Sequence, residues 1–176
     1  MADTIHLEIV TPDGLKLAAD VNEFTAPGAG GEFGVLPGHV PLLTALATGM
    51  VTYQVGAEKH TVAIGRGYAE IAADKATLLT VNFIKKEDID PVVVRLELKA
   101  ADEALDKFEG DLQGFEYTEL LARELWAATE LEVYGDPPPP RMKILNELSF
   151  GHRENYAALG KTDESGSDAA EEKPAH

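Results

Sequence analysis

The sequence predicts an α+β protein, with an antiparallel β domain first and a helical hairpin after it. Three observations support this division. Short β-rich runs separated by turn residues fill residues 1–86, a helical period replaces them over residues 87–134, and prolines and then acidic residues dominate residues 135–176. We therefore expect a β domain, a helical hairpin, and a proline-rich spacer that leads into an acidic tail.

The strand prediction begins at the N-terminus, where Ile5, Leu7 and Ile9 alternate with other residues at the period of a half-buried strand. Turn residues separate this run from later ones. At least seven strands at this spacing indicate a sandwich or a barrel. The further runs lie at residues 15–19, 21–25, 50–55, 59–64, 67–73 and 76–84.

Two amphipathic helices are predicted next. Asp90 can cap the free amides of the first helix, and Pro91 suits its first position. Gly110 is the expected terminator. A short loop containing glycine then predicts that the two helices pair antiparallel. The apolar stripes that define them are Val94, Leu98, Ala101, Leu105 and Phe108, and then Tyr117, Leu121, Leu125, Ala128 and Leu131.

The last part of the chain has a different composition. Residues 137–140 are four prolines, which predict a stiff extended spacer. A further short helix with Met142, Leu145 and Leu148 is expected within residues 141–159. The polar and acidic residues 161–176 predict disorder, and we assign that tail no function.

Composition excludes several functions. The formal net charge of −16 argues against nucleic acid and against anionic lipid as partners. The absence of cysteine excludes disulfides and thiolate metal sites. No basic and apolar leader opens the chain, and no apolar run approaches the roughly 18 residues of a membrane span. We therefore expect a soluble intracellular protein that reaches a membrane only through partners.

Residues 31–50 are the most informative segment. Gly34, Pro37, Gly38 and Pro41 predict a bent backbone path that suits neither helix nor strand. An apolar cluster over residues 42–46 follows and must pack against something. Because this rigid turn carries one carboxylate, Glu32, and one imidazole, His39, it is a candidate docking surface.

Catalytic and ligand-binding hypotheses for this segment have little support. A phosphate loop would need a helix N-terminus after the glycines of residues 28–34, and Pro37 and Pro41 forbid one. His39 as a general base would need an orienting carboxylate, for which Glu32 is the candidate. The five histidines share no metal-ligand spacing. We expect no catalytic residue, metal or cofactor, and a hydrolase with paired carboxylates is the enzymatic alternative.

The pattern G-E-x-G-x-x-P-G-H-x-P-L-L over residues 31–43 resembles the epsilon subunit of F-type ATP synthases, which is called delta in mitochondria. Residues 65–71 resemble that family's G-G-F/Y-A-E-V strand, and residues 76–83 resemble the strand after it. The similarity is strong over about the first 90 residues, looser over the next 45, and absent beyond Tyr134.

The resemblance narrows the fold to a β-sandwich of two sheets and implies a function. It implies a non-catalytic rotor subunit in the central stalk of a proton-translocating synthase, peripheral to the cytoplasmic face of a bacterial inner membrane. The implied partners are the gamma subunit, the ring of c subunits and, through regulation, the alpha/beta catalytic head. The residues implied to contact the rotor ring are Glu32, Gly34, Pro37, Gly38, His39 and Pro41.

The hairpin departs from the family in its nucleotide motif. Many bacterial epsilon subunits carry I/L-D-x-x-R-A, which is associated with ATP binding. Matching Ile89-Asp90 places Val93 at the arginine position, and Arg95 is rotated by about 200° on a helix of ~3.6 residues per turn. Asp90 is therefore expected to act as a helix cap rather than a nucleotide ligand. An ATP-sensing regulatory module is the alternative to the rotor function.

The second helix also departs from the family, where a basic face holds acidic surfaces of the catalytic head. Here Arg123 is the one basic residue among several acids. We expect a solvated acidic face, so that inhibition of ATP hydrolysis would need other chemistry, such as Arg141, Lys143 and Arg153. The acids of this face are Glu116, Glu119, Glu124, Glu130 and Glu132.

Overall fold

Strands occupy most of the first 85 residues. The computed structural model describes residues 4–138, and the statements below concern that range. The strands are β1 (Ile5–Thr11), β2 (Gly14–Val21), β3 (Glu23–Gly28), β4 (Gly31–Val35), β5 (Leu42–Leu46), β6 (Gly49–Val55), β7 (Glu58–Ile64), β8 (Gly67–Ala72), β9 (Lys75–Thr80) and β10 (Phe83–Lys85).

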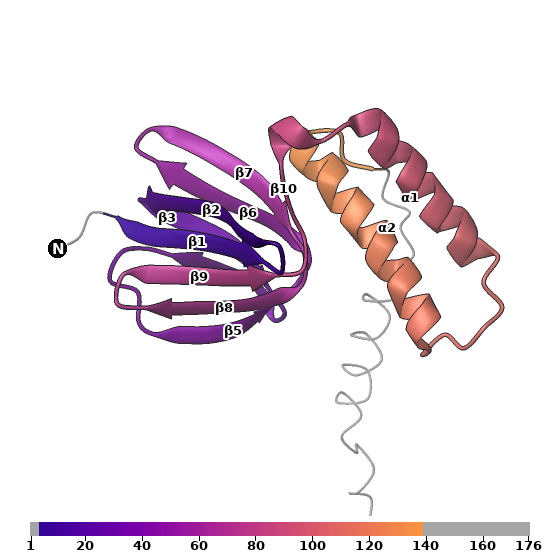
Figure 1. The fold of residues 1–176 in the computed structure, drawn as a ribbon, viewed down its shortest axis with the longest axis horizontal. Helices are drawn as coiled ribbons and strands as arrows, with labels where there is room; N and C mark the ends of the chain where they lie inside the picture. Colours follow the sequence, from indigo (N-terminus) through magenta and orange to yellow (C-terminus); the bar gives the residue numbers. More distant parts are fainter. Residues whose placement is uncertain (1–3, 139–176) are drawn as a thin grey trace, which may run out of the picture. The chain divides into compact units, whose positions relative to one another are not determined.

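These strands fold into a two-layered sandwich (Figure 1). Their hydrogen-bonded order is β10-β7-β6-β3-β5-β8-β9-β1-β2, and β4 pairs with β3 outside that path. The single pair Gly28–Leu46 joins β3 to β5, and so it marks where one layer passes into the other. The predicted β-sandwich is confirmed, with one exception to antiparallel pairing, because β1 runs parallel to β9.

The core lies between the layers and follows from the alternation of apolar residues. In β1, buried and half-buried positions alternate along the whole strand, as predicted. Leu7 and Ile9 belong to the same buried cluster as Phe24, Val51 and Ile64 of the other layer. Each such side chain stabilises the fold by about 1.5–3 kcal/mol relative to its exposure to water.

The structure corrects the strand prediction in two places. Residues 31–35 form β4 and residues 42–46 form β5. Gly34 therefore lies in a strand, where we predicted an irregular backbone. Gly34 pairs with Thr25, and the glycines at Gly28 and Gly31 close the β3–β4 hairpin. The predicted strand at 76–84 is two strands, because the chain bends at Val81 and Asn82 between β9 and β10.

Two α-helices follow the sandwich. A 3₁₀ turn, η1 (Lys86–Asp88), leads to α1 (Pro91–Asp106), and α2 (Phe115–Tyr134) comes after a loop. The Asp90 carboxylate accepts hydrogen bonds from the backbone N–H groups of Val92 at 2.9 Å and Val93 at 3.4 Å. The predicted N-cap of α1 is therefore confirmed.

The ends of the helices differ partly from expectation. α1 ends at Asp106 with Lys107 as its C-cap, four residues before the predicted terminator Gly110. Gly135 ends α2 in the left-handed conformation, at φ 100°, and its N–H donates to the carbonyl groups of Leu131 and Glu132. This geometry favours glycine, which has no Cβ to clash.

The two helices form the predicted antiparallel hairpin (Figure 1). Val94, Ala101 and Leu105 of α1 are buried, as is most of the C-terminal half of α2. Phe108 lies beyond α1, and its ring stands 5.3 Å from that of Tyr117. The stripe predicted for α2 is correct at Tyr117, Ala128 and Leu131, whereas Leu121 and Leu125 are half-buried.

The hairpin packs on the outer face of the sandwich through a second apolar cluster. Ala63 of β7 is fully buried although its side chain points away from the main core, because it meets residues of both helices. Val94 of α1 and Ala127, Leu131 and Val133 of α2 complete this contact with Ile89. The hairpin is therefore held by apolar burial.

The described residues end at 138. The predicted spacer beyond that residue, the helix expected within 141–159 and the tail over 161–176 lie outside them. Within the described part of the chain, neither helix is both long and apolar enough to cross a membrane.

Candidate functional site

The predicted docking turn is the loop of residues 36–41, which connects β4 to β5. Gly38 adopts a positive φ of 78°, a conformation that favours glycine. The backbone N–H of His39 donates to the carbonyl of Leu36 at 3.1 Å, which closes a tight turn around Pro37 and Gly38. The proline fixes one backbone angle and the glycine permits the other, so the loop has a defined shape.

A distant carboxylate holds this loop against the sandwich. The Gly38 N–H donates to Oδ1 of Asp74 at 2.8 Å, across 36 residues of sequence. Asp74 belongs to the turn between β8 and β9, and its backbone also has a positive φ, of 58°. Its carbonyl accepts the N–H of His6 at 2.9 Å. One residue therefore connects the loop, the β8–β9 turn and the start of β1.

The loop presents apolar side chains to solvent. Leu36 is 59% exposed and Val40 is 72% exposed, and Leu43 at the start of β5 is 75% exposed. Nδ1 of His39 lies 2.7 Å from the carbonyl of Val40, which fixes the imidazole against the loop's own backbone. A cluster of exposed apolar residues on a rigid loop is typical of a protein-contact surface rather than of a reaction centre.

The structure separates the residues that the sequence grouped together. Pro37, Gly38, His39 and Pro41 share the loop, but Glu32 and Gly34 lie in β4 before it. Glu32 lies three residues before the end of that strand, about 10 Å at ~3.3 Å per residue. It lines another cavity together with Glu23 and Lys59.

Within the described residues, the side chains considered for acid–base catalysis and for metal binding are not arranged to do either. No hydrogen bond or ion pair described in the structure joins Glu32 to His39, so the orienting carboxylate that His39 would need is absent from it. Among residues 4–138 no group of three or more histidine, aspartate or glutamate side chains is placed to hold a metal ion.

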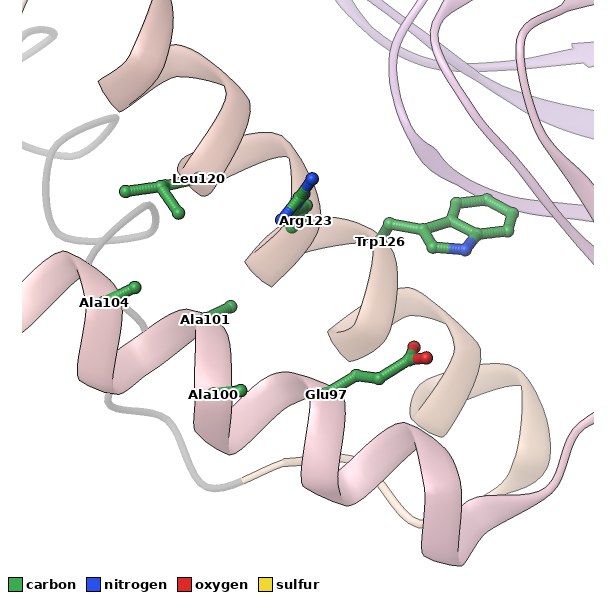
Figure 2. Close-up of a pocket in the computed structure, with 7 residues that line it drawn as sticks. All are labelled: Glu97, Ala100, Ala101, Ala104, Leu120, Arg123 and Trp126. Atoms are coloured by element: carbon green, nitrogen blue, oxygen red, sulfur yellow. The ribbon is translucent and has the colours of Figure 1, made fainter.

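A groove between the two helices is the second candidate site (Figure 2). It has a volume of about 380 Å³ and is lined by small residues of α1, on the side that faces α2. The carboxylate of Glu97 extends from α1 toward α2 at one end of it. The remaining lining residues are Ala100, Ala101, Ala104, Leu120, Arg123 and Trp126.

Two glutamates of α2 are buried, which overturns the predicted solvated acidic face. Glu124 is fully buried and Glu130 is 6% exposed, whereas Glu116 and Glu132 are exposed as expected. Burial raises the pKa of Glu130 to about 7, with a further contribution from the negative charge of Glu97; a hydrogen bond with Trp126 opposes the shift. The hairpin therefore contains a carboxyl group that titrates near neutral pH.

The structure does not complete the nucleotide motif, because no other described residue supplies the arginine that the sequence lacks at position 93. Val93 is half exposed at the position of the motif's arginine. Arg95, the nearest arginine, is bound elsewhere: its guanidinium donates two hydrogen bonds to the carboxylate of Asp136, just beyond α2. Asp90 is occupied as the helix cap, and neither Asp90 nor Val93 lines the groove between the helices.

The fold and the loop define the class of protein to which this chain belongs. It is a β-sandwich of this strand order, followed by a helical hairpin, with an exposed apolar loop at the end of the sandwich. Residues 4–86 match the family described as ATP synthase, Delta/Epsilon chain, beta-sandwich domain. The chain belongs to the ATP synthase epsilon chain family.

Two curated relatives support this assignment. The ATP synthase epsilon chain of Nitratidesulfovibrio vulgaris (strain DP4) is 47% identical over 90 residues, which cover 51% of this chain and 67% of that protein. The ATP synthase epsilon chain of Geotalea daltonii is 40% identical over 126 residues, which cover 71% of this chain and 91% of that protein. The second match is longer than the 83 residues that the family model covers, so the similarity is not confined to the β-sandwich.

A solved structure shares the fold. The similar chain occurs in the cryo-EM structure of the Euglena gracilis mitochondrial ATP synthase, OSCP/F1/c-ring in rotational state 1. It is 23% identical to this chain with a TM-score of 0.57, and the match covers 77% of this chain and 80% of that one.

Proposed function

We propose that this chain is a non-catalytic subunit of the central stalk of a proton-translocating F-type ATP synthase, where it couples rotation of the c-subunit ring to the catalytic head. Membership in the epsilon family is the observation that carries the proposal. The fold shared with a chain of an F1/c-ring assembly supports it. The subunit would then be peripheral to the cytoplasmic face of a bacterial membrane, held there by its partners.

The contribution of such a subunit is mechanical stiffness rather than chemistry. The sandwich has a continuous hydrogen-bonded strand order and a core whose residues are almost fully buried. Interiors packed to this density deform little under load. Torque applied at one end of the sandwich would therefore reach the other end with little loss to internal motion.

The loop of residues 36–41, with the contact residues Pro37, Gly38, His39 and Pro41, is the proposed contact with the c-subunit ring. Leu36 and Val40 provide exposed apolar area, and the hydrogen bond from Gly38 to Asp74 fixes the loop before contact. Preorganisation of this kind lowers the entropy lost on binding. Glu32 and Gly34 of β4, also proposed as contacts, would extend the surface along the strand. The gamma subunit would contact another face of the sandwich.

Co-purification tests this contact. A Leu36→Ser and Val40→Ser double variant should lose retention of the c-subunit ring by at least about tenfold, or ~1.4 kcal/mol, because two central apolar contacts are removed. The matched control is Leu15→Ser and Leu79→Ser, which changes two outward-facing residues that are 59% and 51% exposed elsewhere on the sandwich. If the loop variant and the control retain the ring equally, the proposed contact is wrong.

We propose further that the helical hairpin modulates ATP hydrolysis by the assembled enzyme. Its docking on the sandwich through an apolar cluster separate from the main core, together with the buried carboxyl of Glu130, supports a conformation that can be released. A chain that ends at residue 86 should assemble and raise the rate of ATP hydrolysis. An unchanged rate in an assembled complex would remove this regulatory role and leave coupling intact.

ATP sensing is the alternative, and equilibrium dialysis of the chain against ATP distinguishes it. The rotor proposal predicts millimolar affinity or none, because Val93 replaces the motif's arginine and Arg95 is bound to Asp136. Saturable binding at micromolar ATP would favour the sensor.

A further inference from the structure

The strand β7 is only half covered on its outer side. β10 pairs with residues 62–64 of β7, and no strand of the described chain pairs with residues 58–61 on that side. An edge strand directs some of its backbone N–H and C=O groups away from its neighbour, where they can pair with another chain. Residues 58–61 are therefore a free edge of the sandwich.

A cavity of about 450 Å³ runs along this free edge. Lys59 lines it from β7, Lys85 from β10 and Lys86 from η1. Tyr53 and His60, whose rings stack 5.1 Å apart, form part of its wall, and Val133 of α2 also lines it. Glu87 is the one carboxylate that lines it, so positive charge predominates in the cavity.

The three lysines of this cavity are unusual for the chain. Most basic side chains in residues 4–138 form ion pairs, namely Lys16, Arg66, Lys75, Arg95, Lys99 and Lys107. Within the same range, four have no acidic partner within 4.0 Å: Arg123 and the three lysines of the cavity. In a chain with a net charge of −16, cations that line one cavity without acidic partners indicate a site for an external anion.

We propose that this free edge, with Lys59, Lys85 and Lys86, binds an extended acidic segment of a partner protein as an added strand. The free backbone groups of residues 58–61 supply the main-chain hydrogen bonds of strand addition. Lys59 and Lys85 lie on opposite faces of the sheet, because Lys85 pairs with Val62, three positions along β7 from Lys59. The bound segment must therefore carry acidic side chains on both of its faces.

Nuclear magnetic resonance of the full chain tests this proposal with an acetylated peptide of about eight glutamate and valine residues, long enough for one strand. The amide resonances of residues 58–61 should shift, and hydrogen exchange should slow at those amides of this segment that point to the free side, because only these gain strand hydrogen bonds. Lys59→Gln, Lys85→Gln and Lys86→Gln together should weaken binding about tenfold, as three partly exposed ion pairs imply. The matched control is Lys16→Gln, Lys99→Gln and Lys107→Gln, which removes the same charge elsewhere and should leave binding unchanged.

Three further arms separate strand addition from diffuse charge attraction and from the binding of small anions. A peptide with glutamine in place of glutamate should bind much more weakly, and a peptide N-methylated at alternate residues should not bind, because it cannot form the ladder. Inorganic phosphate should cause no shifts at residues 58–61. Equal binding of the N-methylated peptide, the same shifts with phosphate, or equal loss in both lysine triple variants would each overturn the proposal.

Discussion

At the scale of single residues, Asp74 shows how a turn residue can organise a distant loop. The strands predicted at 67–73 and 76–84 imply a turn between them, and the structure places that turn between β8 and β9. The partner of the Asp74 side chain, the N–H of Gly38, lies 36 residues away, so no pattern in neighbouring residues predicts this hydrogen bond. A turn can be predicted from its own residues, whereas a contact between two turns depends on the finished fold.

Replacing Asp74 with alanine should lower the free energy of unfolding by about 1–2 kcal/mol. The change removes a hydrogen bond to Gly38 and places alanine at a positive φ. Urea denaturation measures the loss, and hydrogen exchange of the Gly38 amide should accelerate. Asp74→Asn is the control, since its side-chain oxygen still accepts and asparagine tolerates this conformation. Equal losses for alanine and asparagine would contradict the role of the hydrogen bond.

Gly67 is a second position where one atom decides stability. A Cβ at this residue would lie 1.8 Å from the carbonyl oxygen of Leu79, on the backbone of β9. Gly67→Ala should therefore lower the free energy of unfolding by at least about 2 kcal/mol, because two strands must separate to admit the methyl group. Gly30→Ala is the matched control, with no atom within 4 Å of the added Cβ. Equal stability of the two variants, measured by thermal unfolding, would contradict this account.

At the scale of elements, the helical hairpin differs most from expectation. The start of α1 was predictable because Asp90 and Pro91 act within one turn of the backbone. The burial of Glu124 was not predicted, because acidic residues on a helix usually face solvent. Its spacing was nevertheless informative: Glu124 lies seven residues from Tyr117 and from Leu131, both of which are buried. Helical geometry places such residues on one face.

Glu130 should make the stability of the hairpin depend on pH. Its pKa of about 7 in the folded chain lies above the ordinary value of 4.5, so the folded state binds the additional proton between these values. The contribution of Glu130 to the free energy of unfolding is therefore complete below pH 4.5. It falls as the pH rises toward about 7, and it stays low above that pH. Glu130→Gln should stabilise the chain at pH 8 by on the order of 2 kcal/mol and have little effect near pH 4.

Unfolding measured from pH 4 to pH 8 tests this expectation. Glu132→Gln is the control, because Glu132 is an exposed glutamate of the same helix. Parallel pH profiles for the parent chain and Glu130→Gln would show that burial of this carboxyl does not set the pH dependence.

At the scale of the whole described chain, the sandwich and the hairpin have separate cores. The larger core lies between the two layers of strands, and the smaller one lies between β7 and the helices. The sequence predicted both elements but not their contact, because Ala63 resembles an ordinary strand residue and small residues leave little amphipathic pattern. The strands β4 and β5 were missed for a related reason: prolines and glycines nearby concealed short strands whose pairing is non-local.

The separation of the cores predicts that the hairpin can be released without unfolding the sandwich. Ala63→Lys places a long cation where the side chain is fully buried against α2. Amides of residues 127–133 should then exchange at least about tenfold faster, while those of β8 and β9 remain unchanged. Leu79→Lys, on an exposed part of the sandwich, should leave the exchange of both sets of amides unchanged. Faster exchange throughout both regions would mean that the two cores are one cooperative unit.

The parallel pairing of β1 with β9 has a consequence for biosynthesis. His6 aligns with Lys75 and Val10 aligns with Leu79, so during synthesis the first strand of the sandwich can pair only after nearly the last strand of the sandwich has been made. Contacts of such long sequence separation form slowly, because a large loop must close before they contribute. The nascent sandwich therefore remains open until residue 80 has emerged. The hairpin, whose contacts are local, needs no such delay.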